Sequence, residues 1–162
     1  MNIWTERLEK AHLPILERWI GREEGALTPN DLPKNSDELP QWFERCTSDP
    51  GRNDFLILAY ETPVGLAGLR KHFGQEKTAE LYLLLCEVNY NLLRTATYAA
   101  LPMLDRAFRD CGSDRVIIRL REQHAWFVEV LERMGFFCVR EGNGLIMLTV
   151  EREEFLQRKY LF

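Results

Sequence analysis

The sequence lacks the features that would mark a membrane, nucleic-acid-binding or exported protein. No apolar run in its 162 residues approaches the roughly 18–20 residues of a membrane-spanning helix. The formal net charge is −4, so the chain has no overall basic surface for nucleic acid. The N-terminal segment, MNIWTERLEK, has acidic residues and no apolar core, unlike a signal peptide. We therefore expect neither a nucleic-acid nor a membrane partner.

The sequence also lacks a cysteine or histidine cluster. Cys46, Cys86, Cys111 and Cys138 form no CxxC pair and no zinc-like spacing with histidine. Free thiols in a reducing cytoplasm are the simplest interpretation, so we expect a cytoplasmic protein without a metal. The length fits one domain with its own core, and we expect residues 1–162 to form it.

The apolar periodicity predicts a mixed α/β domain built on one central sheet. Strands are expected over residues 3–8, 55–61, 64–73, 79–86, 115–122, 136–141 and 145–150. Helices are expected over residues 11–24, after an N-cap at Ser36, over 92–110 and over 124–135. The connections Thr62-Pro63 and GQEKT (74–78) predict an antiparallel meander, and Gly142-Asn143-Gly144 predicts a hairpin.

The stretch NYNLLRTAT (89–97) stands where many folds bind phosphate, yet it contains no glycine. It joins a strand to a helix, and the first N–H groups of a helix are available to an anion. Glycines usually let the backbone approach the phosphates, but Leu92, Leu93 and Arg94 occupy this turn. The residues leave open whether a phosphate site has lost its glycines or never existed.

The order of elements and several strings resemble the GNAT acetyltransferase superfamily, especially its ribosomal-protein N-terminal acetyltransferase-like branch. VLERMGFFCVREG (130–142) resembles the segment after the second cofactor-side helix of that family. AELYLLLC followed by LDRAFRD resembles its fourth strand and next helix, and LIMLTVEREEF resembles its last strand. The resemblance implies an α/β (α+β) fold with a mixed, mostly antiparallel sheet, flanked by helices and splayed between the fourth and fifth strands.

The resemblance also implies acetyl-CoA as cosubstrate. In the family, the pyrophosphate lies on a turn with the pattern Q/R-x-x-G-x-G/A, and Asn91, Arg94 and Ala96 fall on its marked positions. Only Ala96 matches, so the motif is degenerate, and Arg94 could either neutralise a phosphate or fill its place. The residues that the resemblance assigns to the cofactor are Leu84, Leu85, Cys86, Asn91, Leu92, Leu93, Arg94, Thr95, Ala96, Thr97, His124 and Phe127.

The later helix departs from the family as well. His124 stands where many members have Asn, and Phe127 where they often have Ser or Ala. Leu131 replaces the Tyr that protonates the leaving thiolate in many members, and a leucine cannot donate a proton.

Acetyl transfer to an amine needs a base, donors for the thioester oxygen and alignment of the reactants. The resemblance places the oxygen's backbone donor near residues 84–87. Glu80 is the first candidate base, or else a carboxylate near the start of its strand that is solvated or paired with Lys71 or Arg70. Glu87 is the second candidate base, or else a solvated loop residue. Tyr82 could position substrate or donate a proton, or simply pack with a satisfied hydroxyl.

The acceptor side would be formed by the first two helices and their loop. Glu23, Glu24 and Asp31 could form an acidic rim that attracts a cationic amine, or an ordinary solvated loop. His72 has the pKa range of a base, or is a surface residue on its strand. Cys86 could carry an acyl group, or be a buried thiol.

These inferences predict an acetyl-CoA-dependent N-acetyltransferase whose amine acceptor attacks the thioester directly. The acceptor would be a small molecule or a protein N-terminus, and the enzyme a monomer or homodimer. The alternative is a GNAT-fold binding or assembly module that has lost catalysis, because the glycines and the Tyr are missing. A third possibility is an acyltransferase that uses another acyl-CoA or an acyl carrier.

Overall fold

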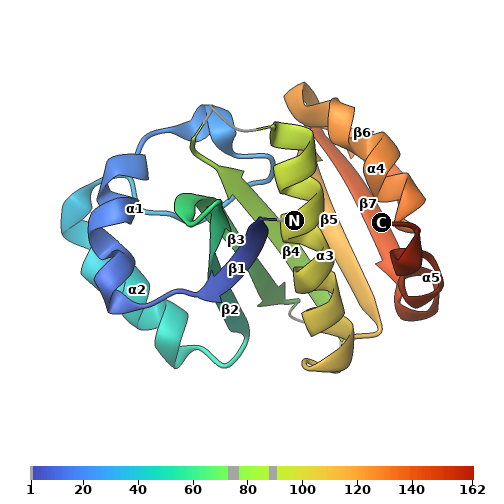
Figure 1. Ribbon diagram of the computed structural model, residues 1–162, viewed down its shortest axis with the longest axis horizontal. Helices are drawn as coiled ribbons and strands as arrows, with labels where there is room; N and C mark the ends of the chain where they lie inside the picture. The colour runs from blue at the N-terminus through green and yellow to red at the C-terminus, as the bar shows by residue number, and fades with distance from the viewer. Residues whose placement is uncertain (1, 73–76, 88–90) are drawn as a thin grey trace.

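One seven-stranded sheet organises the molecule (Figure 1). The computed structural model describes residues 2–72, 77–87 and 91–162. The sheet order is β1-β2-β3-β4-β5-β7-β6, with β4 and β5 parallel and the other neighbours antiparallel. The strands are β1 (Ile3–Arg7), β2 (Arg52–Ala59), β3 (Thr62–Lys71), β4 (Thr78–Leu85), β5 (Arg115–Arg121), β6 (Phe137–Gly142) and β7 (Leu145–Glu151). The predicted mixed, mostly antiparallel sheet is confirmed.

Helices pack against both faces of the sheet. On one face lie α3 (Leu92–Arg109), α4 (Val128–Arg133) and α5 (Arg152–Arg158), and Figure 1 shows α3 running across the central strands. On the other face lie α1 (Leu13–Trp19) and α2 (Leu39–Ser48).

The alternation of side chains along β4 separates two hydrophobic cores. Leu81, Leu83 and Leu85 belong to the core beneath α3, whereas Tyr82 and Leu84 belong to the core beneath α1 and α2. This is the alternation expected from the sequence, because successive side chains of a strand point to opposite faces. Side chains of β4 therefore reach both faces of the sheet.

The predicted splay between the fourth and fifth strands is present. β4 and β5 pair only between Thr78–Leu81 and Arg115–Ile118. β4 continues to Leu85 and β5 to Arg121 without pairing to each other. The two strands therefore leave an opening at their C-terminal ends.

Several element boundaries differ from the prediction near the N-terminal half. The first helix ends at Trp19 rather than residue 24, because Gly21 has a φ of +85° that ends the α-helical path. The cap is Asn35 rather than Ser36, and its side chain accepts from Glu38 N–H at 3.2 Å. The hairpin between β2 and β3 turns at residues 60–61, both with positive φ, and not at Thr62-Pro63.

The C-terminal half follows the prediction more closely. Residues 122–127 form a 3₁₀ helix before α4, so the predicted single helix is two. The hairpin at residues 142–144 is confirmed, with Asn143 and Gly144 at positive φ. The predicted connection at residues 74–78 lies largely outside the described residues.

Candidate active site

The opening between β4 and β5 is filled by the chain itself. Leu27 N–H donates to the carbonyl oxygen of Leu83 at 3.1 Å, and Leu83 N–H donates to Thr28 Oγ1 at 2.9 Å. On the other side, Arg121 N–H donates to the Leu27 carbonyl at 2.8 Å. Ala26 adds an isolated antiparallel bridge to Leu84. Residues 25–28, here called the bridging segment, therefore complete the sheet where β4 and β5 part.

The bridging segment is packed tightly. Ala26, Leu27 and Thr28 are fully buried. A Cβ atom at Gly25 would collide with the carbonyl of Leu85, so only glycine fits at that position. The sequence analysis treated this stretch as a loop. Its signal was the apolar pair Ala26-Leu27, which is unusual in a segment otherwise rich in Pro, Asn and Asp.

The backbone donors for a thioester oxygen are fewer than the sequence suggested. The N–H groups of Cys86 and Glu87 both donate to the Val64 carbonyl, at 2.8 and 3.2 Å. The backbone N–H and C=O groups of alternate residues in a strand point to the same side. Those of Leu83 point toward β5, so within residues 84–87 only those of Leu85 do the same. Leu83 itself, outside the predicted set, also faces the opening, but Thr28 occupies its N–H.

Two acidic residues and His124 lie around the end of this opening. Trp19 Nε1 donates to Glu87 Oε1 at 3.0 Å, which fixes the Glu87 carboxylate beside α1. Glu24 is exposed, and its backbone lies next to the His124 ring. The side chain of Glu23 lies outside the described part. The predicted acidic rim is therefore divided, since Glu24 lies beside His124 whereas Asp31 lies in a separate pocket.

His124 is buried at the end of β5. It has the non-helical torsions φ −109° and ψ 24°, and neither ring nitrogen forms a short hydrogen bond within the described residues. Burial lowers the pKa of His124, and Arg121 adds to that effect, while the Glu24 backbone opposes it. A neutral imidazole near the opening results.

Two other predicted cofactor residues are enclosed. Phe127 is fully buried in the core beneath α3, so its side chain is not accessible to a cofactor, which corrects the prediction. Burial and the neighbouring Glu87 raise the pKa of the Cys86 thiol to about 12. A thiol that stays protonated is a poor nucleophile, so Cys86 matches the buried-thiol alternative.

The predicted phosphate turn divides into an exposed and a buried part. Asn91 caps α3, because its side chain accepts from Arg94 N–H at 3.0 Å. Leu92, Leu93 and Arg94 are exposed. Thr95, Ala96 and Thr97 turn inward and are buried. Residues 89 and 90 of the turn lie outside the described residues.

A groove of about 510 Å³ runs from this helix start toward α4. Arg94 lies on one wall and Arg133 on the other, so two guanidinium groups line it. Arg133 was not among the predicted site residues, because only the packing of α4 beside the start of α3 brings it to this groove. Two arginines suit a pyrophosphate, although the Asn91 side chain already occupies the Arg94 N–H at the helix start. The positive charge of this groove suits the phosphates of CoA, whereas the opening between β4 and β5 is occupied by the bridging segment.

The remaining predicted residues meet in a separate pocket of about 790 Å³ on the face of α1 and α2. Asp31, His72, Glu80 and Tyr82 all line it. Glu80 precedes Leu84 by four residues, or roughly 13 Å along a strand. The candidate bases Glu80 and Glu87 therefore lie at different places in the fold.

Glu80 is held by an arginine that the sequence did not indicate. Arg119 Nε donates to Glu80 Oε2 at 2.6 Å, and His72 Nε2 lies 3.8 Å from the other carboxylate oxygen. The predicted partners Lys71 and Arg70 were wrong. Arg119 reaches Glu80 because the parallel pairing sets β5 beside β4, a contact between residues far apart in sequence.

Tyr82 is fixed by a line of cross-strand neighbours. Asp54, Gly68 and Tyr82 are in register on β2, β3 and β4. Gly68 leaves room for the Tyr82 ring, which would collide with any Cβ there. The phenol reaches over Gly68 and donates to Asp54 Oδ1 at 2.6 Å. Burial and the Asp54 carboxylate raise the pKa of Tyr82 well above its usual value, so it remains a donor to Asp54.

Asp54 lies at the centre of a buried charge network. Its side chain is 2 % exposed and accepts from Arg70 at 2.8 Å and from Arg52 at 3.4 Å. Arg52 also bonds Asp31 at 2.6 Å. Burial alone would raise the pKa of Asp31, but Arg70 and Arg52 outweigh it and the pKa is lowered. Sequence spacing held no signal for this network, since its members come from three strands and a loop.

Comparisons with known proteins agree with this geometry. The family described as "Acetyltransferase (GNAT) domain" matches residues 4–137, so the chain belongs to the GNAT acetyltransferases. It is an N-acetyltransferase by that membership. No curated protein matches the sequence. The ribosomal-protein branch stays a prediction.

Solved structures share the fold at low identity. The spermidine N-acetyltransferase of Vibrio cholerae, in complex with CoA and spermine, has a TM-score of 0.77 at 14 % identity, covering 96 % of this chain and 98 % of that one. The same enzyme with manganese ions has a TM-score of 0.73 at 15 % identity, covering 97 % and 96 %. Apo FdhC, a nucleotide-linked sugar GNAT, has a TM-score of 0.78 at 11 % identity, covering 99 % and 92 %.

The described residues also bear on partners and metals. None of the helices within them is long and apolar enough to cross a membrane. They bring together no group of three or more His, Cys, Asp and Glu side chains suited to a metal ion.

The Tyr82 phenol should contribute measurably to stability. We expect Tyr82→Phe to lower the free energy of unfolding by about 1.5–3 kcal/mol, because a hydrogen bond to a charged group is lost. Tyr60→Phe, at a side chain that is 62 % exposed, is the control and should have little effect. Urea unfolding measures both, and equal losses would contradict the network.

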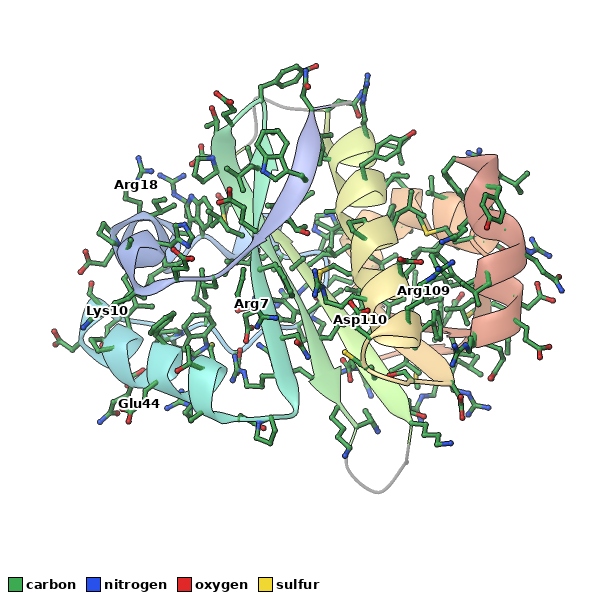
Figure 2. All side chains as sticks on the ribbon, turned by 60° about the horizontal axis from the view of Figure 1, so that its bottom comes forward. Arg7, Lys10, Arg18, Glu44, Arg109 and Asp110 are labelled. Carbon is green, nitrogen blue, oxygen red and sulfur yellow. The ribbon has the colours of Figure 1, made fainter. Side chains whose placement is uncertain are left out.

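Asp31 should make the protein sensitive to acid. Its folded-state pKa is lowered, so its ion pairs stabilise the fold above the usual pKa of 3.8 and are lost as the pH falls below it. When the pH is lowered from neutral to about 3, the free energy of unfolding should fall less in Asp31→Asn than in the wild type. The control is Glu44→Gln, on the outer surface of α2 (Figure 2), which should follow the wild type.

The bridging segment should depend on the Thr28 hydroxyl. We expect Thr28→Val to lower the free energy of unfolding by about 1–3 kcal/mol, because Leu83 N–H loses its acceptor. Amide hydrogen exchange should show faster exchange at Leu83. Thr47→Val, exposed on α2, is the matched control. Unchanged exchange at Leu83 would show that the segment does not rely on this bond.

Proposed function

We propose that this enzyme transfers an acetyl group from acetyl-CoA to a primary amine at the opening between β4 and β5. The observation that carries the proposal is the parallel pair that ends at Leu81 and Ile118, followed along the chain by the start of α3. Family membership supports the same chemistry. Acetyl-CoA would supply an activated thioester carbonyl.

The CoA phosphates would bind at the start of α3. Arg94 and Arg133 would neutralise them from the two walls of the groove, and the exposed helix start would add N–H donors. The N–H groups of Leu83 and Leu85, which both face the bridging segment, would serve the thioester oxygen once that segment withdraws. Withdrawal of the bridging segment is therefore part of the proposed binding step.

His124 would accept the proton of the attacking amine. Its ring lies against the backbone of Glu24, next to the bridging segment, so movement of that segment would also uncover the imidazole. The lowered pKa keeps the imidazole neutral, as a base must be. Glu87, held by Trp19 at 3.0 Å, would attract the ammonium form of the acceptor. Glu80 is committed to Arg119 and would shape the pocket instead.

A closed bridging segment also favours a second candidate function. If the segment never opens, the domain would act as a binding or assembly module without catalysis. Thr28 and Leu27 then act only to complete the sheet. Another acyl-CoA or an acyl carrier would use the same groove and remains an alternative donor.

Calorimetric titration with acetyl-CoA tests the proposal. We expect the wild type to bind, and Arg94→Ala to bind about tenfold more weakly, because a charge-assisted contact to phosphate is lost. Arg109→Ala is the matched control, since Arg109 lies at the far end of the same helix (Figure 2) and should leave affinity unchanged. Absence of wild-type binding, with binding gained in Arg94→Ala, would mean that Arg94 fills the phosphate position.

A further inference from the structure

The groove between α3 and α4 combines positive charge with apolar surface. Arg94 and Arg133 supply the charge, and no Asp or Glu is among the described residues that line it. Its volume of about 510 Å³ is within the range of small-molecule sites. The apolar and aromatic lining consists of Leu93, Tyr98, Val130, Leu161 and Phe162. A ligand with both an anionic part and a flat apolar part therefore suits this groove.

Much of this apolar lining is open to solvent. Leu93 is 44 % exposed and Leu161 is 65 % exposed, while Tyr98 and Phe162 are partly exposed. These side chains come from two distant segments, the first turns of α3 and the end of the chain after α5. Exposed apolar side chains that gather at one groove are typical of a ligand site. Such side chains can bind the flat face of a nucleobase.

Arg133 is held by an aromatic ring. Its guanidinium carbon lies 5.1 Å from the centre of the Phe162 ring, and no carboxylate of the described residues pairs with it. Glu129 and Glu132, its acidic neighbours on α4, do not line the groove. A guanidinium stacks through its flat face and donates hydrogen bonds from its edge. Phe162 can therefore hold Arg133 in place while the N–H groups of Arg133 bind a phosphate.

We infer that this groove binds the nucleotide end of CoA, and that Phe162 positions Arg133 for one of its phosphates. Tyr98 and Leu161 contact the adenine. That the nucleotide belongs to an acyl donor rests on the proposed function. A nucleotide has the anionic groups and the flat base that the groove suits, whereas phosphopantetheine on a carrier protein has a phosphate but no base. The donor is therefore a free acyl-CoA and not an acyl carrier protein.

Two fragments of CoA test the nucleotide site. Adenosine 3′,5′-bisphosphate and phosphopantetheine are titrated calorimetrically into the wild type. We expect the nucleotide to bind at least about tenfold more tightly, because base stacking adds to the phosphate contacts. Tyr98→Ala and the surface variant Leu161→Ser should each reduce this preference. Tyr160→Ala is the control, since Tyr160 is 79 % exposed and does not line the groove. Equal affinity for the two fragments would overturn the inference.

A double-mutant cycle tests whether Phe162 acts through Arg133. We expect Phe162→Leu, which keeps an apolar side chain, to weaken nucleotide binding by about threefold to tenfold. Arg133→Ala should weaken it by at least about tenfold, and the double variant should bind no more weakly than Arg133→Ala alone. Additive losses would show that Phe162 does not position Arg133.

The same titrations separate this inference from the proposed function, because they require no turnover. Nucleotide binding that depends on Phe162 and Arg133 supports the site even if no amine is acetylated, in which case the proposed function fails alone. Acetylation of an amine by a protein that does not bind the nucleotide would overturn the site and leave the proposed function standing.

Discussion

The short parallel pairing of β4 with β5 is the constraint on which the rest of the structure depends. The pairing ends at Leu81 and Ile118, yet both strands continue into a buried region. Backbone N–H and C=O groups that leave a sheet in the interior must find other partners, because an unpaired buried polar group is costly. Leu83 and Arg121 find theirs in Leu27 and Thr28. The loop after α1 is thereby tied to the centre of the sheet.

The bridging segment closes the opening with hydrogen bonds that a ligand could also form. The bonds from the bridging segment to Leu83 can be replaced by equivalent bonds to a ligand, so their exchange costs less than their loss. The same movement would uncover His124, which is buried beside the Glu24 backbone. In the proposed mechanism, one stretch of chain therefore controls both the N–H donor for the thioester oxygen and the base. Cofactor binding and access to the acceptor are expected to be coupled through it.

The second organising feature is the charge network around Asp54. Its carboxylate is buried between two arginines and the Tyr82 phenol, and breaking such a cluster leaves an uncompensated buried charge. The network holds Arg70 and Tyr82 in place along the floor of the pocket. Charges held in fixed positions recognise a ligand without being reordered on binding.

The sequence by itself determined the sheet, the two-sided alternation of β4, the hairpin at residues 142–144 and the start of α3. These depend on local periodicity and on turn residues, which one stretch of chain contains in full. It also indicated the family and the mismatch at Arg94, where the family pattern has glycine. Only the tertiary structure decided that Glu80 pairs with Arg119, that Phe127 is core and that Thr28 occupies Leu83 N–H. The two contacts join residues 39 and 55 positions apart, and the burial of Phe127 depends on packing, so no local pattern encodes them.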